Sequence, residues 1–298
     1  MAPNSNQSTF RNPHAGTNTT QGGTLYVIAT PIGNLEDITL RALRILKEVH
    51  LIAAEDTRRT AKLLAHYAIP TRLTSLHEHN EIKKSATLLR HLKSGNSLAL
   101  VSDAGTPLLS DPGEKLVRAV LSTGLKVQTV PGPSAITAAL SMSAIDTSSF
   151  IFLGFPPSRS NARDKWFSAI SEEKRTLIIF ESPHRIRTTL KCIYKTFGNR
   201  TISLCREMTK KHEDLVIGPI NDVLNNIKEP KGEYTVIISG NIDSEKARAL
   251  PTAQEIMLEF CYLTDKESSS RRSAVKTLAD RYSVSSREIY NLIEREKK

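Results

Sequence analysis

Residues 25–34 read Leu25-Tyr-Val-Ile-Ala-Thr-Pro-Ile-Gly-Asn34. The first part, 25–30, is a short continuous apolar run, which predicts a buried strand. The strand stops at 31–37, a turn that begins with Pro31 and holds further residues that break regular structure. Apolar residues then recur at helical spacing from Thr39 to Val49. A strand, a turn and a helix in this order predict the beginning of an α/β domain.

The same alternation continues along the chain and falls into two series. The first predicts strands at 51–54, 97–102 and 127–130 and helices at 59–67, 80–92, 114–122 and 134–142. The second predicts strands at 150–155, 176–180, 201–205 and 234–239 and helices at 161–171, 184–197 and 221–227. Beyond 243 only helices are expected, at 253–263, 272–282 and 286–296. This pattern predicts two α/β domains, the first with a mainly parallel sheet, and a small C-terminal helical segment.

We therefore expect a disordered arm at 1–23, α/β domains at 24–145 and 146–243, and a helical tail at 250–298. The arm contains no Leu, Ile or Val, so it cannot bury enough apolar surface to fold. In the tail, Ser286 is the expected N-cap of the last helix. Residues 282–285 are the expected turn of a helix–turn–helix-like pair.

Composition excludes several classes of protein. Of 298 residues, 39% are hydrophobic and 24% charged, which excludes a chain that is disordered throughout. No run approaches the roughly 18 apolar residues of a bilayer span, so we expect no membrane association. The net charge is +10, and residues 155–212 hold 13 basic against 5 acidic side chains. That excess in the second domain indicates a polyanionic partner, although a solvated basic face has the same composition.

The sequence predicts no metal centre. Cys192, Cys205 and Cys261 have neither CxxC nor zinc-site spacing, and we expect free thiols in a reducing, cytoplasmic protein. His77 and His79 are two residues apart, which places them on opposite faces of a strand.

Loops rich in Pro and Gly follow the predicted strands of the first domain at 31–34, 102–107 and 131–135. Ligands of open α/β sheets bind beyond the carboxyl ends of the strands, so these loops predict a small-molecule pocket. Asp103 offers a carboxylate to an amine or hydroxyl group, and Gly105 allows a close backbone approach. The structural alternative is that Asp103 caps a turn and Ser134 caps the next helix.

Other polar clusters also lie at strand ends. Each mixes acids with bases, so each offers a candidate general base or phosphate clamp. Helix caps and surface ion pairs explain the same residues. The clusters lie at 55–59, 77–81, 181–185 and 206–210.

Five ordered motifs resemble the tetrapyrrole methylase superfamily and, within it, the branch that methylates ribosomal RNA. They lie at 25–38, 54–58, 102–107, 131–135 and 180–185, and the similarity runs from about 25 to 240 and again over 272–293. The resemblance implies a class III methyltransferase with S-adenosylmethionine as methyl donor. In such enzymes the cofactor lies in the cleft between two α/β domains of a homodimer.

The resemblance also implies which residues bind the cofactor. The first loop, Thr30-Pro-Ile-Gly33, departs from the Gly-rich loop of many members. The branch that methylates RNA shares that departure, so the departure argues against a porphyrin substrate and not against the cofactor. The implied cofactor residues are Pro31, Ile32, Asp103, Gly105, Thr106, Ser134, Ala135, Phe180, Tyr234 and Thr235.

The implied reaction is 2′-O-methylation of the decoding-site cytidine 1402 of 16S rRNA within the small ribosomal subunit. As a hypothesis, the ribose oxygen attacks the sulfonium methyl group in line, and the protein mainly orients the reactants. Glu181 is the first candidate for a base and Asp56 the second. Candidate RNA contacts are Arg58, Arg185 and Arg206 for phosphates, and His77 and Asn80 for the nucleotide.

Two other functions fit part of the sequence. Corrin and porphyrin precursors are polycarboxylates that also favour arginine, so a methylase of such a precursor would have a similar charge. The other alternative is a non-enzymatic RNA-binding scaffold. The role of the helical tail has two alternatives: it binds rRNA, or it packs against the dimer.

Overall fold

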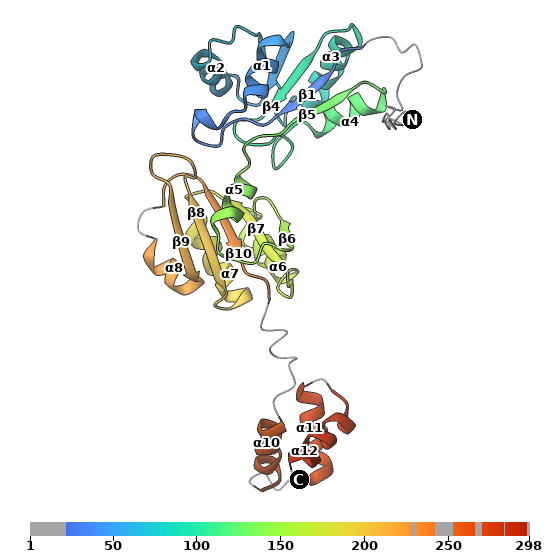
Figure 1. Cartoon of the computed structure of the whole chain (residues 1–298), viewed down its shortest axis with the longest axis vertical. Coiled ribbons are helices and arrows are strands. Elements are labelled where there is room, and N and C mark those ends of the chain that lie inside the picture. The colour runs from blue at the N-terminus through green and yellow to red at the C-terminus, as the bar shows by residue number, and fades with distance from the viewer. Residues whose placement is uncertain (1–21, 228–229, 242–252, 266–269, 283, 297–298) are drawn as a thin grey trace, which may run out of the picture. The chain divides into compact units, whose positions relative to one another are not determined.

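The computed structural model describes residues 22–227, 230–241, 253–265, 270–282 and 284–296 (Figure 1). The chain divides into two units, Met1–Ser134 and Ala135–Lys298. The expected arm at 1–23 lies outside the described residues except for Gly22 and Gly23. Gly23 is part of the fold, because its N–H donates to the Leu92 carbonyl at 2.7 Å. No helix within the described ranges is long and apolar enough to cross a membrane.

The first unit holds one parallel sheet with the strand order β3-β2-β4-β1-β5, which confirms the expected α/β class with a parallel sheet. The sheet is built from short strands joined by helices. The elements are β1 (Leu25–Ile28), η1 (Leu35–Asp37), α1 (Leu40–Glu48), β2 (Leu51–Ala54), α2 (Thr57–His66), β3 (Leu73–Ser75), α3 (Glu81–Lys93), β4 (Leu98–Val101), α4 (Glu114–Ser122) and β5 (Val127–Val130).

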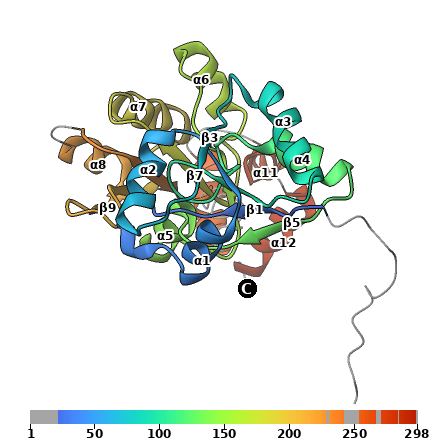
Figure 2. The ribbon, with the colours of Figure 1, turned by 90° about the horizontal axis from the view of Figure 1, so that it is seen from above.

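Both faces of this sheet are covered, which explains why its inner strands are continuously apolar. Helices α1 and α2 pack on one face, where Leu46 and Leu64 meet Ile52. Helices α3 and α4 pack on the other face, where Leu88 and Leu116 belong to a second cluster. Figure 2 shows the two pairs of helices on opposite sides of β1. Because the faces are closed, the loops at the strand ends are where a ligand can reach the sheet.

Glu81, predicted within a polar cluster, is buried and joins two helices. It lies in the first turn of α3, and its Oε1 accepts from the N–H groups of Gly113 (3.0 Å) and Lys115 (2.8 Å) at the start of α4. The carboxylate therefore satisfies backbone donors that a helix start leaves unpaired. Glu81 is one of the acids that sequence analysis offered as a base or clamp, and its contacts are those of a helix cap.

We expect Glu81→Ala to lower the free energy of unfolding by about 1–3 kcal/mol, because buried donors lose their acceptor. Urea denaturation measures the effect, with Glu114→Ala on the exposed start of α4 as the matched control. An unchanged denaturation midpoint for Glu81→Ala would contradict this structural role.

The second unit begins with a five-stranded mixed sheet of order β6-β7-β10-β8-β9, in which only β6 and β7 pair in parallel. Its central strand, β10, is buried at all five positions. The elements are α5 (Ala135–Met142), β6 (Phe150–Phe152), α6 (Ser160–Ser168), β7 (Thr176–Glu181), α7 (Ile186–Phe197), β8 (Thr201–Arg206), β9 (Asp214–Pro219), α8 (Ile220–Asn226) and β10 (Tyr234–Ile238). The α5 helix, expected in the first domain, lies within this unit and contacts β10.

Three C-terminal helices form a bundle with a core of its own, and they match the expected helical segment. They are α10 (Ala253–Asp265), α11 (Arg271–Tyr282) and α12 (Ser286–Glu296), and Phe260, Leu278 and Ile293 contribute one core residue from each helix. The N-cap of α12 is Ser285 rather than the expected Ser286. Ser285 Oγ accepts from the Glu288 N–H at 3.2 Å, and Glu288 Oε2 accepts from the Ser285 N–H at 2.9 Å, which is a capping box.

Candidate active site

The loops that follow β1 and β4 are tied together by their backbones. The Thr30 N–H donates to the Gly105 carbonyl, and the Gly105 N–H donates to the Thr30 carbonyl, both at 2.9 Å. The buried Thr30 hydroxyl donates to the Ser102 carbonyl at 3.1 Å. Since β1 and β4 are parallel neighbours, their carboxyl ends lie at one edge of the sheet. These bonds hold the two loops side by side at that edge.

Gly105 has a left-handed backbone conformation and precedes the residue that binds the loop after β5. Its φ is +78°, a conformation that glycine adopts at little cost, and a Cβ there would lie 3.4 Å from Cγ2 of Ile32. The Thr106 hydroxyl donates to the Pro133 carbonyl in the loop after β5 at 3.3 Å. The structure thus brings together the loops that carry the first-unit part of the predicted cofactor set. That part consists of Pro31, Ile32, Asp103, Gly105, Thr106 and Ser134.

The remaining predicted cofactor residues belong to the second unit. Phe180 on β7 and Thr235 on β10 face each other as strand partners, and Tyr234 and Thr235 are buried. The Phe180 ring packs edge-on against Phe152 with 4.8 Å between ring centroids. Ala135 is the first residue of α5. A cofactor role for these four remains a prediction.

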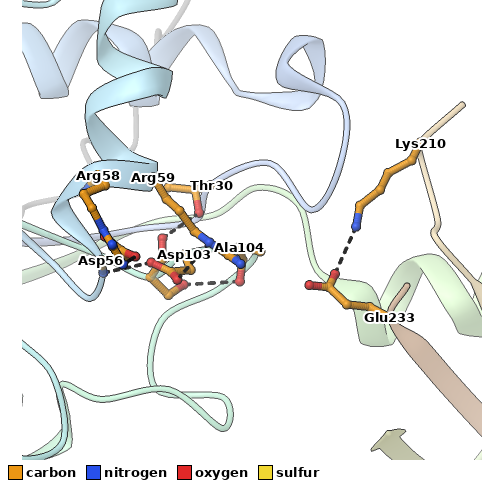
Figure 3. A network of polar contacts seen from close by, with 9 residues as sticks. Thr30, Asp56, Arg58, Arg59, Asp103, Ala104, Lys210 and Glu233 are labelled. Atoms are coloured by element: carbon orange, nitrogen blue, oxygen red, sulfur yellow. Dashed lines mark hydrogen bonds and ion pairs between the residues drawn. The ribbon is translucent and has the colours of Figure 1, made fainter. Parts of the chain in front are cut away.

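Asp103 and Asp56 are linked at the ends of β4 and β2. Asp103 Oδ1 accepts from the Asp56 N–H at 2.9 Å, and its Oδ2 lies 3.6 Å from Arg59 Nε. The Asp56 carboxylate accepts from Nε and Nη2 of Arg58 at 3.0 and 2.8 Å. Figure 3 shows these four side chains converging. The hydrogen bonds from Arg58 hold the pKa of the Asp56 carboxyl well below its usual range, so Asp56 is a weak base.

A hollow of about 130 Å³ opens beside this network. Thr30, Pro31 and Asp103 line it together with Arg59 and Lys62 from α2. Sequence analysis included Arg59 only within the polar cluster at 55–59 and missed Lys62. Their spacing of three on the predicted helix places them on one face, which is the signal that was available.

Carboxyl groups also gather near Asp103. Burial raises the pKa of Asp111 to about 7, with smaller contributions from the nearby charges of Glu55 and Asp103. Burial likewise raises the pKa of Glu55, and the charge of Asp103 adds to that rise. Sequence analysis missed Asp111, because the contact of its loop with the end of β4 is tertiary.

Glu181, the first candidate for a base, ends β7 with its side chain fully buried. Its Oε1 accepts from the Ser182 N–H at 2.8 Å, and its Oε2 accepts from the Thr189 hydroxyl at 2.6 Å. Arg185 Nη2 lies 3.3 Å from Oε2. These contacts describe a buried, fully hydrogen-bonded carboxylate.

The predicted phosphate ligands differ in their surroundings. Arg58 is exposed, and within the described part of the chain its guanidinium pairs with Asp56. Arg185 Nη2 donates to the Pro157 carbonyl at 3.2 Å as well as facing Glu181, so its charge is largely engaged. Arg206, at the end of β8, lies 3.4 Å from Asp214 and lines a hollow of about 220 Å³ with Tyr234.

Lys210 belongs to the same predicted cluster as Arg206 and forms an ion pair with Glu233 at 3.2 Å (Figure 3). It also lies 2.8 Å from Glu207. Burial opposes a rise in the pKa of Lys210, but its two carboxylate partners raise it on balance. Lys210 therefore carries a stable charge that these acids largely neutralise.

His77 and Asn80 are held to each other in the turn before α3. Asn80 Oδ1 accepts from the His77 N–H at 3.0 Å, and Asn80 Nδ2 lies 3.0 Å from His77 Nε2. The expectation that His77 and His79 lie on a strand is wrong, because β3 ends at Ser75 and a turn follows. Within the described ranges, no three His, Cys, Asp or Glu residues are grouped so as to hold a metal ion.

A family model for Tetrapyrrole (Corrin/Porphyrin) Methylases matches residues 24–224. That range covers the first sheet, the loops described above and every strand of the second sheet except β10. The chain belongs to the tetrapyrrole methylase family, and it is a methyltransferase.

The relatives of this chain narrow the class. A protein of Halalkalibacterium halodurans is 42% identical over 278 residues, 92% of this chain and 96% of its own length. A protein of Thermotoga maritima is 46% identical over 220 residues, which are 73% of this chain and 99% of its own length. Both relatives are named ribosomal RNA small subunit methyltransferase I.

Solved structures agree on the fold. Uroporphyrin-III-C-methyltransferase from Thermus thermophilus superposes with a TM-score of 0.52 at 16% identity, covering 77% of this chain and 97% of that one. A diphthine synthase superposes with a TM-score of 0.56 at 14% identity, covering 72% and 89%. At such identities the likeness supports the fold alone.

Proposed function

We propose that this protein transfers a methyl group from S-adenosylmethionine to a ribose 2′-hydroxyl of 16S rRNA in the small ribosomal subunit. The observation that carries the proposal is the 42% identity over 96% of the length of a relative named ribosomal RNA small subunit methyltransferase I. The basic residues of 155–212 suit an RNA substrate, because phosphate contacts supply affinity. The proposed nucleotide is the decoding-site cytidine 1402. We place the reaction in the cytoplasm and in a homodimer.

The first-unit loops fit the methyl donor. S-adenosylmethionine supplies a methyl group on a positively charged sulfur and also carries an ammonium group and ribose hydroxyls. Asp103 offers carboxylate oxygens to such donors at the ligand-binding edge of the sheet. Gly105 leaves open the space beside Ile32 that a side chain would occupy. Arg59 and Lys62 beside Asp103 suit the donor's carboxylate.

The main contribution of the chain to the reaction is orientation. As bases for the 2′-hydroxyl, Glu181 and Asp56 remain predictions. Glu181 is buried with its oxygens already accepting hydrogen bonds, and Asp56 is held ionised by Arg58. Both sets of contacts favour a positioning role over proton transfer.

We expect Asp103→Ala to weaken S-adenosylmethionine binding about 10- to 100-fold, as the loss of a hydrogen bond to a charged group does. Titration calorimetry measures the dissociation constant. Asp37→Ala, at an exposed acid of the same unit, is the matched control and should leave it unchanged. Asp103→Asn keeps one acceptor oxygen and should lose less. Equal affinity in Asp103→Ala and the parent protein would place the cofactor elsewhere.

The proposed reaction is tested on small subunits from a strain that lacks this gene. The purified protein and labelled S-adenosylmethionine are added, and ribose methylation is mapped by primer extension at low nucleotide concentration. A single new stop at the decoding site is expected. Transfer to no subunit and to no naked rRNA would refute the proposal and favour a small-molecule substrate.

A further inference from the structure

The C-terminal bundle has a hollow of about 800 Å³ on its surface, within the about 300–1,000 Å³ usual for sites that hold small-molecule-sized groups. Four cationic side chains line it, Arg271, Arg272 and Lys276 on α11 and Arg287 on α12. All four are exposed, and none of their side chains takes part in a hydrogen bond or ion pair with a described residue. One acid, Glu294, also lines the hollow, so the charge of the lining is positive by three.

Its apolar lining includes an accessible aromatic ring. Phe260, Val275 and Ile293 form the lining on the core side. Tyr290, one turn after Arg287 on α12, also lines the hollow and is 56% exposed. An exposed ring that lines the same hollow as four cations offers a stacking face for a base and ligands for its phosphates.

We propose that this hollow binds single-stranded RNA, with phosphates on Arg271, Arg272, Lys276 and Arg287 and an unpaired base on Tyr290. The charge selects a polyanion. The concave shape favours a strand whose bases are already free, because a base of duplex DNA must first leave its stack. The inference rests on the proposed function, since the RNA is that of the methylated subunit.

The bundle lies outside the residues that the family model matches. The Thermotoga maritima relative is matched over 99% of its length by 73% of this chain, so about a quarter of this chain has no counterpart there. The family match at 24–224 likewise ends before α10. A module outside the matched residues suits substrate capture rather than methyl transfer.

The test compares full-length variants for binding to a labelled single-stranded RNA of mixed sequence over a series of salt concentrations. In the combined variant R271A/R272A/K276A/R287A, we expect the dissociation constant to rise about 10- to 100-fold near 0.1 M salt. The slope of log affinity against log salt is negative, and its magnitude should decrease by about 3, since each phosphate contact on a single strand contributes about 0.7. Arg295→Ala, an exposed cation of α12 outside the hollow, is the control.

Substitutions of Tyr290 test the proposed base contact independently of the phosphate contacts. Tyr290→Ala should weaken RNA binding about 5- to 100-fold, whereas Tyr290→Phe keeps the stacking face and should bind as the parent does. Circular dichroism confirms that the bundle remains helical in each variant.

Several outcomes would overturn the proposal. The proposal fails if the parent protein binds no RNA, or if the hollow variants bind RNA as tightly as the parent does. It also fails if the parent binds duplex DNA more tightly than RNA, or if the hollow variants lose self-association and keep their RNA affinity. Methyl transfer to subunits is measured in parallel. If the parent transfers no methyl group while the hollow variants still lose RNA affinity, the proposed function fails and the RNA site stands. If transfer is normal and RNA affinity unchanged, only the RNA site fails.

Discussion

Glu181→Ala is expected to lower the free energy of unfolding by about 3–5 kcal/mol, the usual cost of breaking a buried ion pair. Its carboxylate is fully buried and accepts from Ser182 and Thr189. Removing it leaves Arg185 with its charge partly uncompensated. Urea denaturation of the variant measures the loss.

The matched control is Glu173→Ala, which removes a carboxylate that also pairs with an arginine, Arg175, but lies nearer the surface. Exposed pairs contribute about 1 kcal/mol or less, so its loss should be much smaller. The comparison also tests Glu181 as a base. A Glu181→Ala protein with parental stability and no methyl transfer would reverse our assignment and restore Glu181 to the reaction.

Asp111→Asn is expected to stabilise the protein at pH 8 by about 2–4 kcal/mol. The pKa of the folded-state carboxyl is about 7, against an ordinary 3.8, and that difference corresponds to about 4 kcal/mol at most. Between these two values the folded protein keeps a proton that the unfolded chain has lost. Stability therefore falls as pH rises through this window, and the full penalty is present above pH 7.

The amide that replaces the Asp111 carboxyl in this variant carries no charge at any pH in this range. The variant should accordingly match the parent near pH 4 and exceed it increasingly up to pH 8, as thermal or urea denaturation across pH will show. Asp37→Asn, at an exposed carboxyl, is the control and should leave the pH profile unchanged. A parent profile that is flat between pH 4 and 8 would show that Asp111 ionises normally.

The regular structure follows from the sequence where burial leaves a periodic signal. The helix 114–122, the strand 127–130 and the helix 286–296 match α4, β5 and α12 residue for residue. The two strands missed by sequence analysis, β3 and β9, are both edge strands. None of their residues is buried. In β3 only Leu73 is apolar, and in β9 the apolar run is limited to 215–217 and is followed at once by Gly218 and Pro219.

The site was predictable to the level of loops but not of contacts. The candidate ligand loops at 31–34, 102–107 and 131–135 follow from the rule that parallel strands present their carboxyl ends together. Whether a carboxylate at a strand end faces solvent or the interior depends on tertiary packing. Glu181 therefore looked like an available base, and its enclosure by Thr189 and Arg185 came only with the placement of α7.

The position of β10 has a consequence for how the chain is made. The first sheet has all its strands once Val130 has been synthesised, whereas the second lacks its middle strand until Ile238. Until β10 has been translated, β7 and β8 each have an unpaired edge where β10 will lie. Exposed strand edges of this kind can pair with other chains. We therefore expect this protein to be most prone to aggregation, and most dependent on chaperones, while the second unit is being synthesised.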